Sequence, residues 1–398
     1  NSKKIMKEID TDVLIIGAGL VGLVVAHSLS SLNYKVTVID RSPFIKTKKS
    51  FNDTRTVAVS EGSKQFLESL SLWTYLDKHA EPIKTIKVYD RISTNKILFS
   101  NNIKNKKLGY VIENKKFSEI LNTKLLDFDN TKIFNNTILQ KIEVNKQYSK
   151  SYMQNKEINS RLVIAADGKN SVTRKLVGNK VFKKNYSESA LVLNFFHEKK
   201  LNNTAYEVFY NTGPLAILPM RSFKNFFQST IIWSNENEFL VKLMHSHKDF
   251  LLNYIDEQVG EITGKIIKIN SVQKFPLSAH INDSFVNKRL IYVGDSAHSI
   301  HPIAGQGWNL GVNDVKNLNQ VCIESKKNKI EIGSDLFCKN YNDLSYNKAF
   351  QLFQITDKLN THFKKSGYFY RLLSGVGFKI INNNLSLKNK ITKYAMGF

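Results

Sequence analysis

Short apolar runs alternate with a helical pattern at the start of the chain. Residues 12–16 and 35–39 are runs of β-branched residues and leucine, the kind of run that forms buried parallel strands. Between them, residues 23–32 place apolar side chains in a helical pattern, and residues 290–293 form another buried-strand run far downstream. The pattern predicts an α/β unit with parallel strands near the N-terminal end and a further buried strand much later in the chain.

A glycine-rich turn joins the first predicted strand to the helix. Gly17, Gly19 and Gly22 form a G-x-G-x-x-G sequence, and Asp40 follows the second strand. In dinucleotide-binding folds the first glycine permits a tight turn, the second lets the backbone approach a pyrophosphate, and the third allows close helix packing. Free N–H groups at the helix start attract phosphate, and the carboxylate suits a ribose diol. The turn predicts a dinucleotide site and leaves FAD and NAD open.

A second polar, glycine-rich stretch follows the run at 290–293. Gly294 and Asp295 come directly after it, and residues 305–307 are Gly-Gln-Gly just before another helical pattern. Carboxyl ends of strands are where open α/β sheets place ligand contacts. Fixed N–H dipoles at a helix start stabilise negative charge such as that of a reduced flavin. We expect Asp295 to contact a ribityl chain and Gly305 to Gly307 to contact the flavin ring edge.

The same stretch allows two other interpretations. Asp295, His298 and His301 are spaced by three residues, which suggests metal ligands on one helical face. Pro302 and the nearby glycines argue against a continuous helix there. A structural turn with hydrogen-bonded histidines is the other alternative, but it leaves the Gly-Gln-Gly sequence unexplained.

The pattern changes to period two between about residues 185 and 285. Residues 190–196, 205–210, 216–220 and 229–233 have the composition and alternation of short strands. This predicts an antiparallel sheet that covers the flavin. Three of its side chains are candidates for lining an aromatic substrate, with ordinary sheet core as the alternative for each: Tyr206, Phe209 and Leu218.

Composition adds mainly a large positive charge. The 398 residues carry a formal net charge of +24, with 42% hydrophobic and 23% charged residues. The basic residues are dispersed, and neither zinc-finger spacing nor an RNP-like motif is present, so we expect no nucleic-acid partner. We interpret most of the charge as compositional bias, with attraction to anionic lipid as the alternative.

Cysteine usage and hydropathy bear on location. Cys322 and Cys338 are too few for a disulfide framework, which fits a reducing cytoplasm. The apolar stretch at 13–26 is too short to span a membrane. Residues 358–398 contain eight basic residues and no Asp or Glu, interspersed with aromatics. Such a segment either lies in an anionic membrane interface or caps the fold as a helix. We expect a cytoplasmic protein, peripheral at the inner face of the membrane if the segment binds lipid.

Together these motifs resemble the class A flavoprotein monooxygenases, the group of para-hydroxybenzoate hydroxylase, and within it the ubiquinone-biosynthesis hydroxylases. The likeness includes residues 53–60, 166–174, 213–219 and 301–311. Lys115 departs from the family, which has arginine there, and the two differ in donor geometry. The resemblance implies that these residues bind the cofactor: Gly17, Gly19, Gly22, Asp40, Arg55, Asp167, Gly168, Asp295, Pro302, Gly305, Gln306, Gly307 and Asn309.

The resemblance also implies an activity. FAD would be reduced by NAD(P)H, a transient reductant without a dinucleotide domain of its own, and a C4a-hydroperoxyflavin would hydroxylate a polyprenylated phenol or quinone precursor. The cofactor carries this chemistry, so we expect no side-chain triad and assign no catalytic residue. The alternatives are another flavoenzyme of this fold, such as a polyprenyl reductase, and a flavin-binding subunit of a biosynthetic complex with little activity, which Lys115 favours.

The expected fold is α/β, or α+β overall. A Rossmann-like FAD-binding domain is interleaved with an antiparallel-sheet substrate domain and followed by a C-terminal helical segment. The expected boundaries are 1–75, 100–184 and 286–325 for the FAD-binding domain, 76–99 and 185–285 for the substrate domain, and 326–398 for the helical segment.

Overall fold

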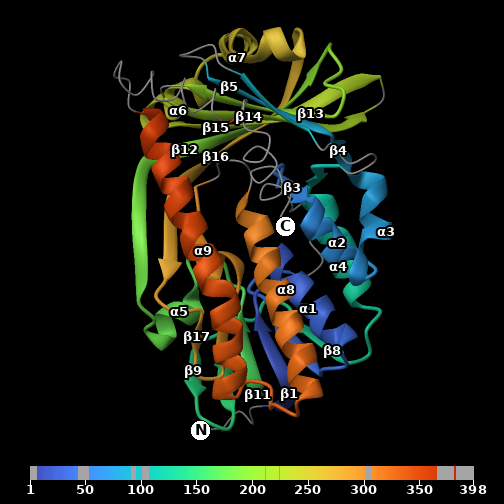
Figure 1. Cartoon of the computed structure of the whole chain (residues 1–398), viewed down its shortest axis with the longest axis vertical. Helices are drawn as coiled ribbons and strands as arrows, with labels where there is room; N and C mark the ends of the chain where they lie inside the picture. Colours follow the sequence, from blue (N-terminus) through green and yellow to red (C-terminus); the bar gives the residue numbers. More distant parts are fainter. Residues whose placement is uncertain are drawn as a thin grey trace.

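A computed structural model gives the architecture of the chain (Figure 1). It describes residues 7–43, 53–90, 96–100, 107–210, 212–223, 225–301, 306–364 and 381. Within these residues the chain forms two large sheets, a small third sheet and a layer of long helices. The predicted mixed α/β class is confirmed.

The first large sheet has parallel strands at its centre. Its order is β17-β18-β11-β1-β2-β8, and the pairs from β18 to β8 are all parallel. The antiparallel strands β9 and β10 join it through β11. The strands are β1 (Lys7–Ile16), β2 (Val36–Ile39), β8 (Thr131–Phe134), β9 (Lys141–Val144), β10 (Ser149–Met153), β11 (Lys156–Ala165), β17 (Val286–Asn287) and β18 (Leu290–Tyr292).

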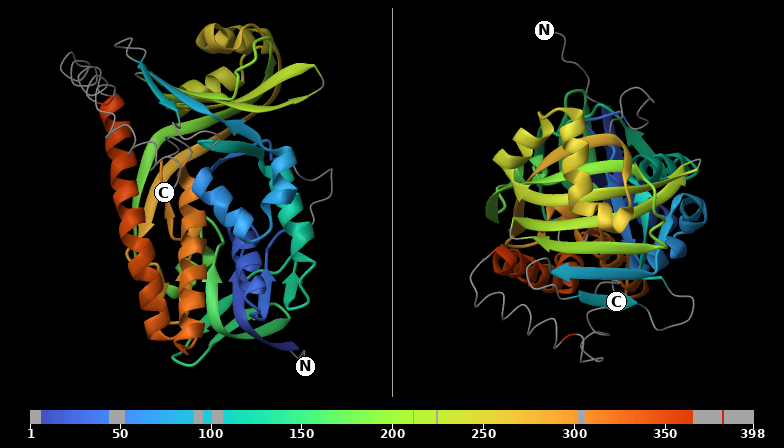
Figure 2. Two further views of the ribbon diagram at one scale, coloured as in Figure 1. Left: turned by 45° about the vertical axis from the view of Figure 1, so that its right-hand side comes forward. Right: turned by 90° about the horizontal axis from the view of Figure 1, so that it is seen from above.

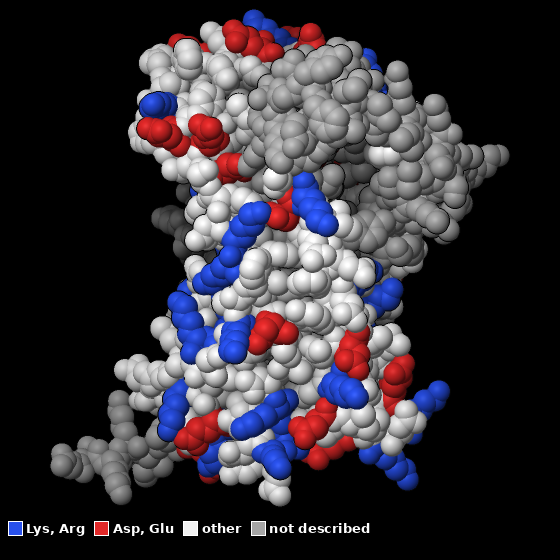
Figure 3. Space-filling view, turned by 60° about the vertical axis from the view of Figure 1, so that its left-hand side comes forward, with Lys and Arg blue, Asp and Glu red and all other residues white. Residues whose placement is uncertain are grey.

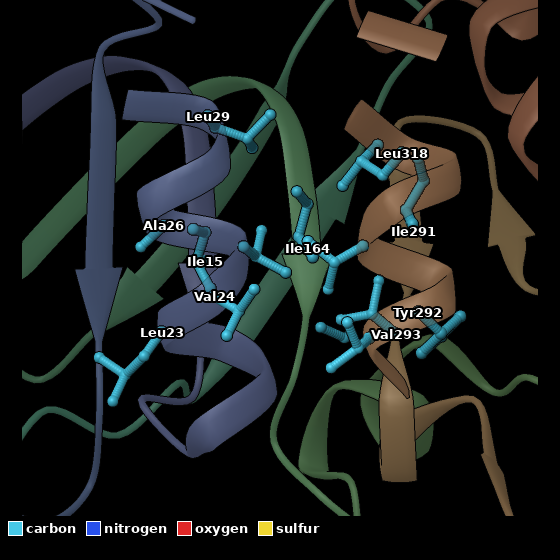
Figure 4. Close-up of a cluster of buried hydrophobic side chains, with 14 of the residues drawn as sticks. Ile15, Leu23, Val24, Ala26, Leu29, Ile164, Ile291, Tyr292, Val293 and Leu318 are labelled. Carbon is cyan, nitrogen blue, oxygen red and sulfur yellow. The ribbon is translucent and has the colours of Figure 1, made fainter. Parts of the chain in front are cut away.

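The core of this unit lies between the sheet and its helices. The central strands are apolar on both faces, as expected for buried parallel strands, and Leu14, Ile15 and Ile164 are completely buried. Figure 4 shows Leu23 and Val24 of one helix and Leu318 of another beside these strands, and the two helices contact each other. The hydrophobic effect therefore fixes both helices on the sheet.

Four helices form the layer beside this sheet. Helix α1 contacts both α4 and α8, and α8 contacts α9. Figure 1 shows α8 and α9 running side by side along the molecule. Outside the second large sheet, the described helices are α1 (Leu20–Ser31), α2 (Glu61–Ser69), α3 (Trp73–Leu76), α4 (Asn114–Leu125), α5 (Val172–Val177), α8 (Gln306–Lys327) and α9 (Asp335–Lys364), with the 3-10 turns η1 (Asp77–His79) and η2 (Gly294–Ser296).

The second large sheet confirms the strands predicted from period two. Its order is β19-β16-β12-β15-β14-β13-β5-β6, and its pairs are antiparallel except for β13 with β5, which are parallel. The strands are longer than the sequence indicates: β5 (Thr85–Asp90), β6 (Lys96–Ser100), β12 (Val181–His197), β13 (Thr204–Tyr210), β14 (Gly213–Phe223), β15 (Phe226–Glu236), β16 (Ile266–Asn282) and β19 (His298–Ser299).

The outer face of the second sheet is covered by helices α6 (Asn237–Met244) and α7 (Lys248–Thr263). Leu193, Ile217 and Trp233 of the sheet pack with Ile255 and other apolar residues of the two helices in a separate core. Figure 2 shows α7 above the sheet and the first unit below it. The opposite, inner face of the sheet is therefore turned toward the parallel-sheet unit.

Two structural features connect the units. Strands β12 and β16 are 17 residues long each and extend beside the first unit. A three-stranded sheet of β3 (Thr56–Ser60), β7 (Gly109–Glu113) and β4 (Glu81–Ile83) lies at the other side. The expected domain boundary after residue 184 falls within β12. We propose that the two large sheets mark the flavin-binding and substrate domains.

The described surface mixes both signs of charge. On the face shown in Figure 3, lysine and arginine are interspersed with aspartate and glutamate. In the part of the chain that the structure describes, we find no helix with the length and hydropathy to cross a bilayer. Of the basic segment at 358–398, residues 365–398 lie outside the described residues apart from residue 381.

The two glycine-rich segments meet at Val21, in the first turn of α1. A Cβ on Gly294, whose φ is +59°, would lie 3.2 Å from both methyl groups of Val21. A Cβ on Gly311 in α8 would lie 2.9 Å from the nearer methyl group and 3.2 Å from the Gly294 Cα. Real Cβ atoms rarely approach other atoms so closely. Glycine at both positions therefore lets the end of β18 and the start of α8 pack on α1.

This contact predicts a difference between two glycines of α8. Gly311→Ala and Gly307→Ala gain the same helix propensity, but a Cβ on Gly307 meets no atom within 4 Å. We expect Gly311→Ala to be about 1–3 kcal/mol less stable than Gly307→Ala, because it overpacks the Val21 contact. Urea unfolding of the two variants measures this. Equal free energies of unfolding would show that Val21 moves aside without loss of stability, which would contradict the prediction.

Candidate functional site

A long cavity begins at the first glycine turn and ends beneath the second sheet. Its volume is about 1180 Å³, above the roughly 300–1,000 Å³ typical of sites for small ligands. The lining comes from the turn between β1 and α1, the end of β2, the segment before β3, the start of α4, the end of β11, and β16. The predicted residues that line it are Gly17, Gly19, Asp40, Arg55, Asp167 and Gly168.

The three glycines of the first turn are required for different reasons. Gly17 has a φ of +107°, and a Cβ there would lie 2.3 Å from the Ala166 carbonyl oxygen. A Cβ on Gly22 would lie 2.1 Å from the Gly17 carbonyl oxygen. Gly19 lines the cavity, and no other atom lies within 4 Å of a Cβ placed there. The fold itself requires the outer two, whereas the middle glycine leaves space on the cavity side.

The start of α1 provides donors for an anion. Gly19 is its N-cap residue and offers no side-chain cap, so the first N–H groups of the helix remain available to a ligand. The positive end of the helix dipole points the same way. A pyrophosphate fits this place in both charge and space.

Asp40 has a second role that the sequence analysis did not find. Its Oδ2 accepts a hydrogen bond from the Ala18 N–H at 2.6 Å, and its Oδ1 accepts one from the Ser42 N–H at 2.7 Å. The carboxylate thus braces the glycine turn. Each oxygen has a further lone pair, so Asp40 retains the capacity to accept a ribose hydroxyl.

Arg55 is held at the far end of the cavity by Asp53. Its Nε and Nη2 donate to the two carboxylate oxygens at 2.8 and 2.7 Å. Burial raises the pKa of the Asp53 carboxyl group, but the hydrogen bonds and the charge of Arg55 lower it more, so the pKa of Asp53 lies below its usual range. The guanidinium also lies over the Phe275 ring of β16, 5.1 Å from its centroid. The arrangement fixes a permanent positive charge beside the inner face of the second sheet.

The Asp-Gly pair after β11 contributes an acceptor. Asp167 Oδ2 accepts hydrogen bonds from the N–H and hydroxyl of Thr173, both at 2.9 Å. Its Oδ1 is buried and has no protein donor among the described residues. Gly168 has a φ of +81° and open space on its Cβ side. A buried acceptor beside an open cavity suits a hydroxyl group of the cofactor.

Arg174 connects the Asp-Gly segment to the second glycine-rich segment. The side chain is 3% exposed. It donates from Nη2 to the Lys169 carbonyl oxygen at 2.7 Å and from Nη1 to the Ser296 carbonyl oxygen at 3.0 Å. One arginine therefore sets the distance between two loops that are more than 120 residues apart in the chain.

Asp295 lies beyond the residues that line the large cavity but close to two of them. Surrounding protein raises the pKa of its carboxyl group, and the positive charges of His298, Lys169 and Arg55 oppose this. Lys169 and Arg55 both line the cavity. The side chain itself is exposed. Asp295 therefore lies near the part of the cavity that Lys169 and Arg55 line.

The other predicted residues of the second segment separate into two groups. Pro302 and Gly305 lie outside the described residues, as does the side chain of Gln306. Gly307 lies in the first turn of α8. Asn309 accepts hydrogen bonds from the Ser60 N–H and the Ser63 hydroxyl, both at 2.9 Å, and donates to the Ala58 carbonyl oxygen. It holds α8 against β3 and α2, a structural role that the sequence analysis missed.

Asp295, His298 and His301, whose spacing suggested a metal site, have other surroundings in the structure. His298 Nε2 lies 2.6 Å from Asp314 Oδ2, which also accepts the Gly294 N–H at 2.9 Å. His301 lies beside Glu188, and the charge of His298, then those of Lys169 and Arg55, affect the pKa of the Asp295 carboxyl group. Among the described residues, no group of three His, Cys, Asp or Glu side chains is arranged to hold a metal. The buried His298–Asp314 pair fixes the turn that presents Asp295.

The candidate substrate-lining residues lie on different faces of the second sheet. Tyr206 pairs with Ile217, which belongs to the outer core under α7. Its ring stacks on Tyr89 at 6.1 Å. Phe209 and Leu218 belong to the opposite, inner face. Tyr206 is therefore corrected to an outer-face residue, because a shift of one position along a strand reverses the direction of a side chain.

The open space at Gly19 gives a test that separates binding from folding. Gly19→Ser keeps a good N-cap residue but adds atoms where the pyrophosphate is expected. We expect FAD to bind about 10-fold more weakly or worse, with no loss of stability in the flavin-free protein. Gly260→Ala in α7, where a Cβ makes ordinary contacts, is the control. Fluorescence titration with FAD measures the affinities. Unchanged binding by Gly19→Ser would show that the pyrophosphate does not bind at Gly19.

Comparisons with known proteins show the family to which the chain belongs. A family model described as "FAD binding domain" matches residues 10–327. The chain is 26% identical over 394 residues to "Ubiquinone hydroxylase UbiM" of Neisseria meningitidis, covering 97% of this chain and 85% of that protein. It is 25% identical to "3-demethoxyubiquinol 3-hydroxylase" of Escherichia coli, covering 97% and 98%.

Among solved structures, p-nitrophenol 4-monooxygenase PnpA from Pseudomonas putida has the same fold, with a TM-score of 0.78, 17% identity, and coverage of 98% of this chain and 99% of that one. The family match includes both glycine-rich segments, the segment at 53–55 that carries Arg55 (the arginine loop) and the whole second sheet. This protein therefore belongs to the FAD-binding domain family.

Proposed function

We propose that this protein is an FAD-dependent monooxygenase that hydroxylates the aromatic ring of a polyprenylated phenol in ubiquinone biosynthesis, with NAD(P)H and O2 as co-substrates. The observation that carries the proposal is the convergence of the glycine turn, Arg55 and the Asp-Gly pair around one extended cavity, with Asp295 close to two of its basic residues. The names of the relatives point to the same chemistry.

The proposed arrangement of FAD follows the cavity. Gly19 and the start of α1 would hold the pyrophosphate, and Asp40 the adenosine ribose. Asp295 would hold the ribityl chain. Bound FAD supplies the redox chemistry, which is reduction by NAD(P)H followed by transfer of one oxygen atom from O2 to the ring. The protein contributes position, electrostatics and exclusion of water.

Charge at the flavin end supports this role. Arg55 carries a permanent positive charge. The hydrogen bond and charge of Asp53, and then the charge of Asp295, raise the pKa of Arg55 against the effect of burial. Burial lowers the pKa of Lys169, against the attraction of Asp295. Two cations near the flavin ring favour its acceptance of electrons from NAD(P)H. Lys115, the departure from the family pattern, lines the same cavity and adds a third cation.

The inner face of the second sheet supports exclusion of water. Ala205, Leu218 and Met220 pack with Ile83 and Val111 of the small third sheet in a separate apolar cluster. This cluster closes one side of the space between the sheets. An aromatic substrate between Phe209 and the flavin end of the cavity would be shielded from solvent, which limits wasteful loss of the transferred oxygen.

The activity is tested with the purified, flavin-loaded protein. We expect NAD(P)H oxidation to rise about 10-fold or more when a prenylated phenol is added, with a hydroxylated product detected by mass spectrometry. Asp295→Ala should lose bound flavin, because the ribityl contact is removed, whereas Asp343→Ala on the exposed side of α9 should retain it. A protein that binds FAD and never hydroxylates a phenol would instead be a flavin-binding subunit.

As a finer assignment, we propose that the basic segment at the C-terminal end brings the protein to an anionic membrane, where a polyprenyl-tailed substrate resides. Its charge and aromatic content support this. Removal of residues 365–398 should shift the protein from sedimenting with phosphatidylglycerol vesicles to the supernatant, with flavin content as the folding control. Sedimentation equal to that of the full chain would contradict the assignment.

A further inference from the structure

Glu207 lies on the inner face of the second sheet. It is in β13, paired with Ala216 of β14 and with Val88 of β5. Directly paired residues share a face of a sheet, so the same row continues through Ile232 of β15 and Val192 of β12. The carboxyl group is thus placed in a row of apolar side chains.

This row belongs to the face that meets the flavin end of the cavity. Val192 is two residues from Asn194, which donates from Nδ2 to the Thr54 carbonyl oxygen beside Arg55 at 2.7 Å. Val192 pairs with Gln273, two residues from Phe275, whose ring contacts Arg55. Side chains two positions apart in a strand point the same way. Glu207 therefore faces the same space as the groups that hold the arginine loop.

Glu207 has no hydrogen-bond or ion-pair partner among the described residues. The residue is half-buried. Burial raises the pKa of its carboxyl group to about 8. A carboxyl group among apolar neighbours needs a donor, and the protein supplies none here.

Charged groups on the neighbouring elements are occupied or directed elsewhere. Lys87 of β5 lies over the Tyr206 ring on the outer face, 5.7 Å from its centroid. Arg221 is at the far end of β14. Helix α9 contacts β13 and β14 and carries Asp357 and Lys358; the Asp357 carboxylate accepts hydrogen bonds from other described residues, and Lys358 is exposed. The donor for Glu207 is therefore expected from the substrate.

We propose that Glu207 binds the ring hydroxyl of the aromatic substrate and accepts its proton, which makes the substrate a phenol or hydroquinone and not an aryl ether. The phenolic O–H bond breaks, an O–H bond forms on the carboxylate, and the electron pair stays on the phenolic oxygen. The ring becomes more electron-rich at the positions ortho and para to that oxygen, where the second oxygen atom is added. The inference rests on the proposed function for the hydroxylation step, but binding tests it separately.

The first experiment measures binding to the flavin-loaded protein. Changes in flavin absorbance report the dissociation constants of 2-prenylphenol and of its methyl ether, 2-prenylanisole, which lacks the donor. At about pH 9, where Glu207 is mainly ionised, the wild type should prefer the phenol by about 10-fold or more, the strength of a hydrogen bond to a charged group. Glu207→Ala should bind both alike. Glu257→Gln, which removes an exposed carboxylate from α7 on the outer face, should keep the wild-type preference.

The second experiment measures how kcat/KM for the phenol depends on pH. Because the raised pKa leaves Glu207 protonated at neutral pH, the acceptor form increases as pH rises, and the rate should climb through about pH 8. Glu207→Gln has nearly the same shape and cannot take a proton, so this rise should disappear. The phenol itself ionises near pH 10, well above this range.

The outcomes separate the two proposals. An unchanged preference for the phenol in Glu207→Ala, or an unchanged pH profile in Glu207→Gln, overturns the role of Glu207 while hydroxylation by the wild type still stands. A wild type that prefers the phenol through Glu207 but never hydroxylates it supports the binding role and refutes the monooxygenase. If Glu207→Ala loses its flavin, the phenol preference of Glu207→Gln decides, and it should fall below that of Glu257→Gln.

Discussion

The close packing of Val21 against Gly294 and Gly311 is the contact on which the site depends. It places the start of α1, the end of β18 and the start of α8 within van der Waals distance of one another. A side chain at either glycine would push the two segments apart. Two regions separated by more than 270 of the 398 residues therefore become neighbouring sides of one binding site.

The electrostatic arrangement follows from this contact. Once the end of β18 is fixed, Arg174 binds the Ser296 carbonyl oxygen on one side and the Lys169 carbonyl oxygen on the other. Asp295 then lies close enough to Lys169 and Arg55 for their charges to affect its pKa. The backbone packing thus comes first, and it brings together a helix dipole, an acceptor and two cations suited to an anionic dinucleotide.

Sequence patterns predicted what depends on local chemistry. The glycine turn, its flanking strands and the position of Asp295 follow from residue types within a few positions of one another. The sequence analysis missed contacts that require the folded chain: the bracing of the turn by Asp40, the bonds of Asn309 to β3 and α2, and the His298–Asp314 pair. The faces of β13 also depend on its register with β14, so alternation alone did not distinguish Tyr206 from Phe209.

A crystal structure of the protein purified with its flavin tests the central claim most directly. The account predicts a single FAD molecule whose pyrophosphate meets the N–H groups at Gly19 and whose ribityl chain meets Asp295, each within about 4 Å. The flavin ring should lie between Arg55 and the inner face of the second sheet. Electron density that places FAD in contact with only one of Gly19 and Asp295 would contradict the account.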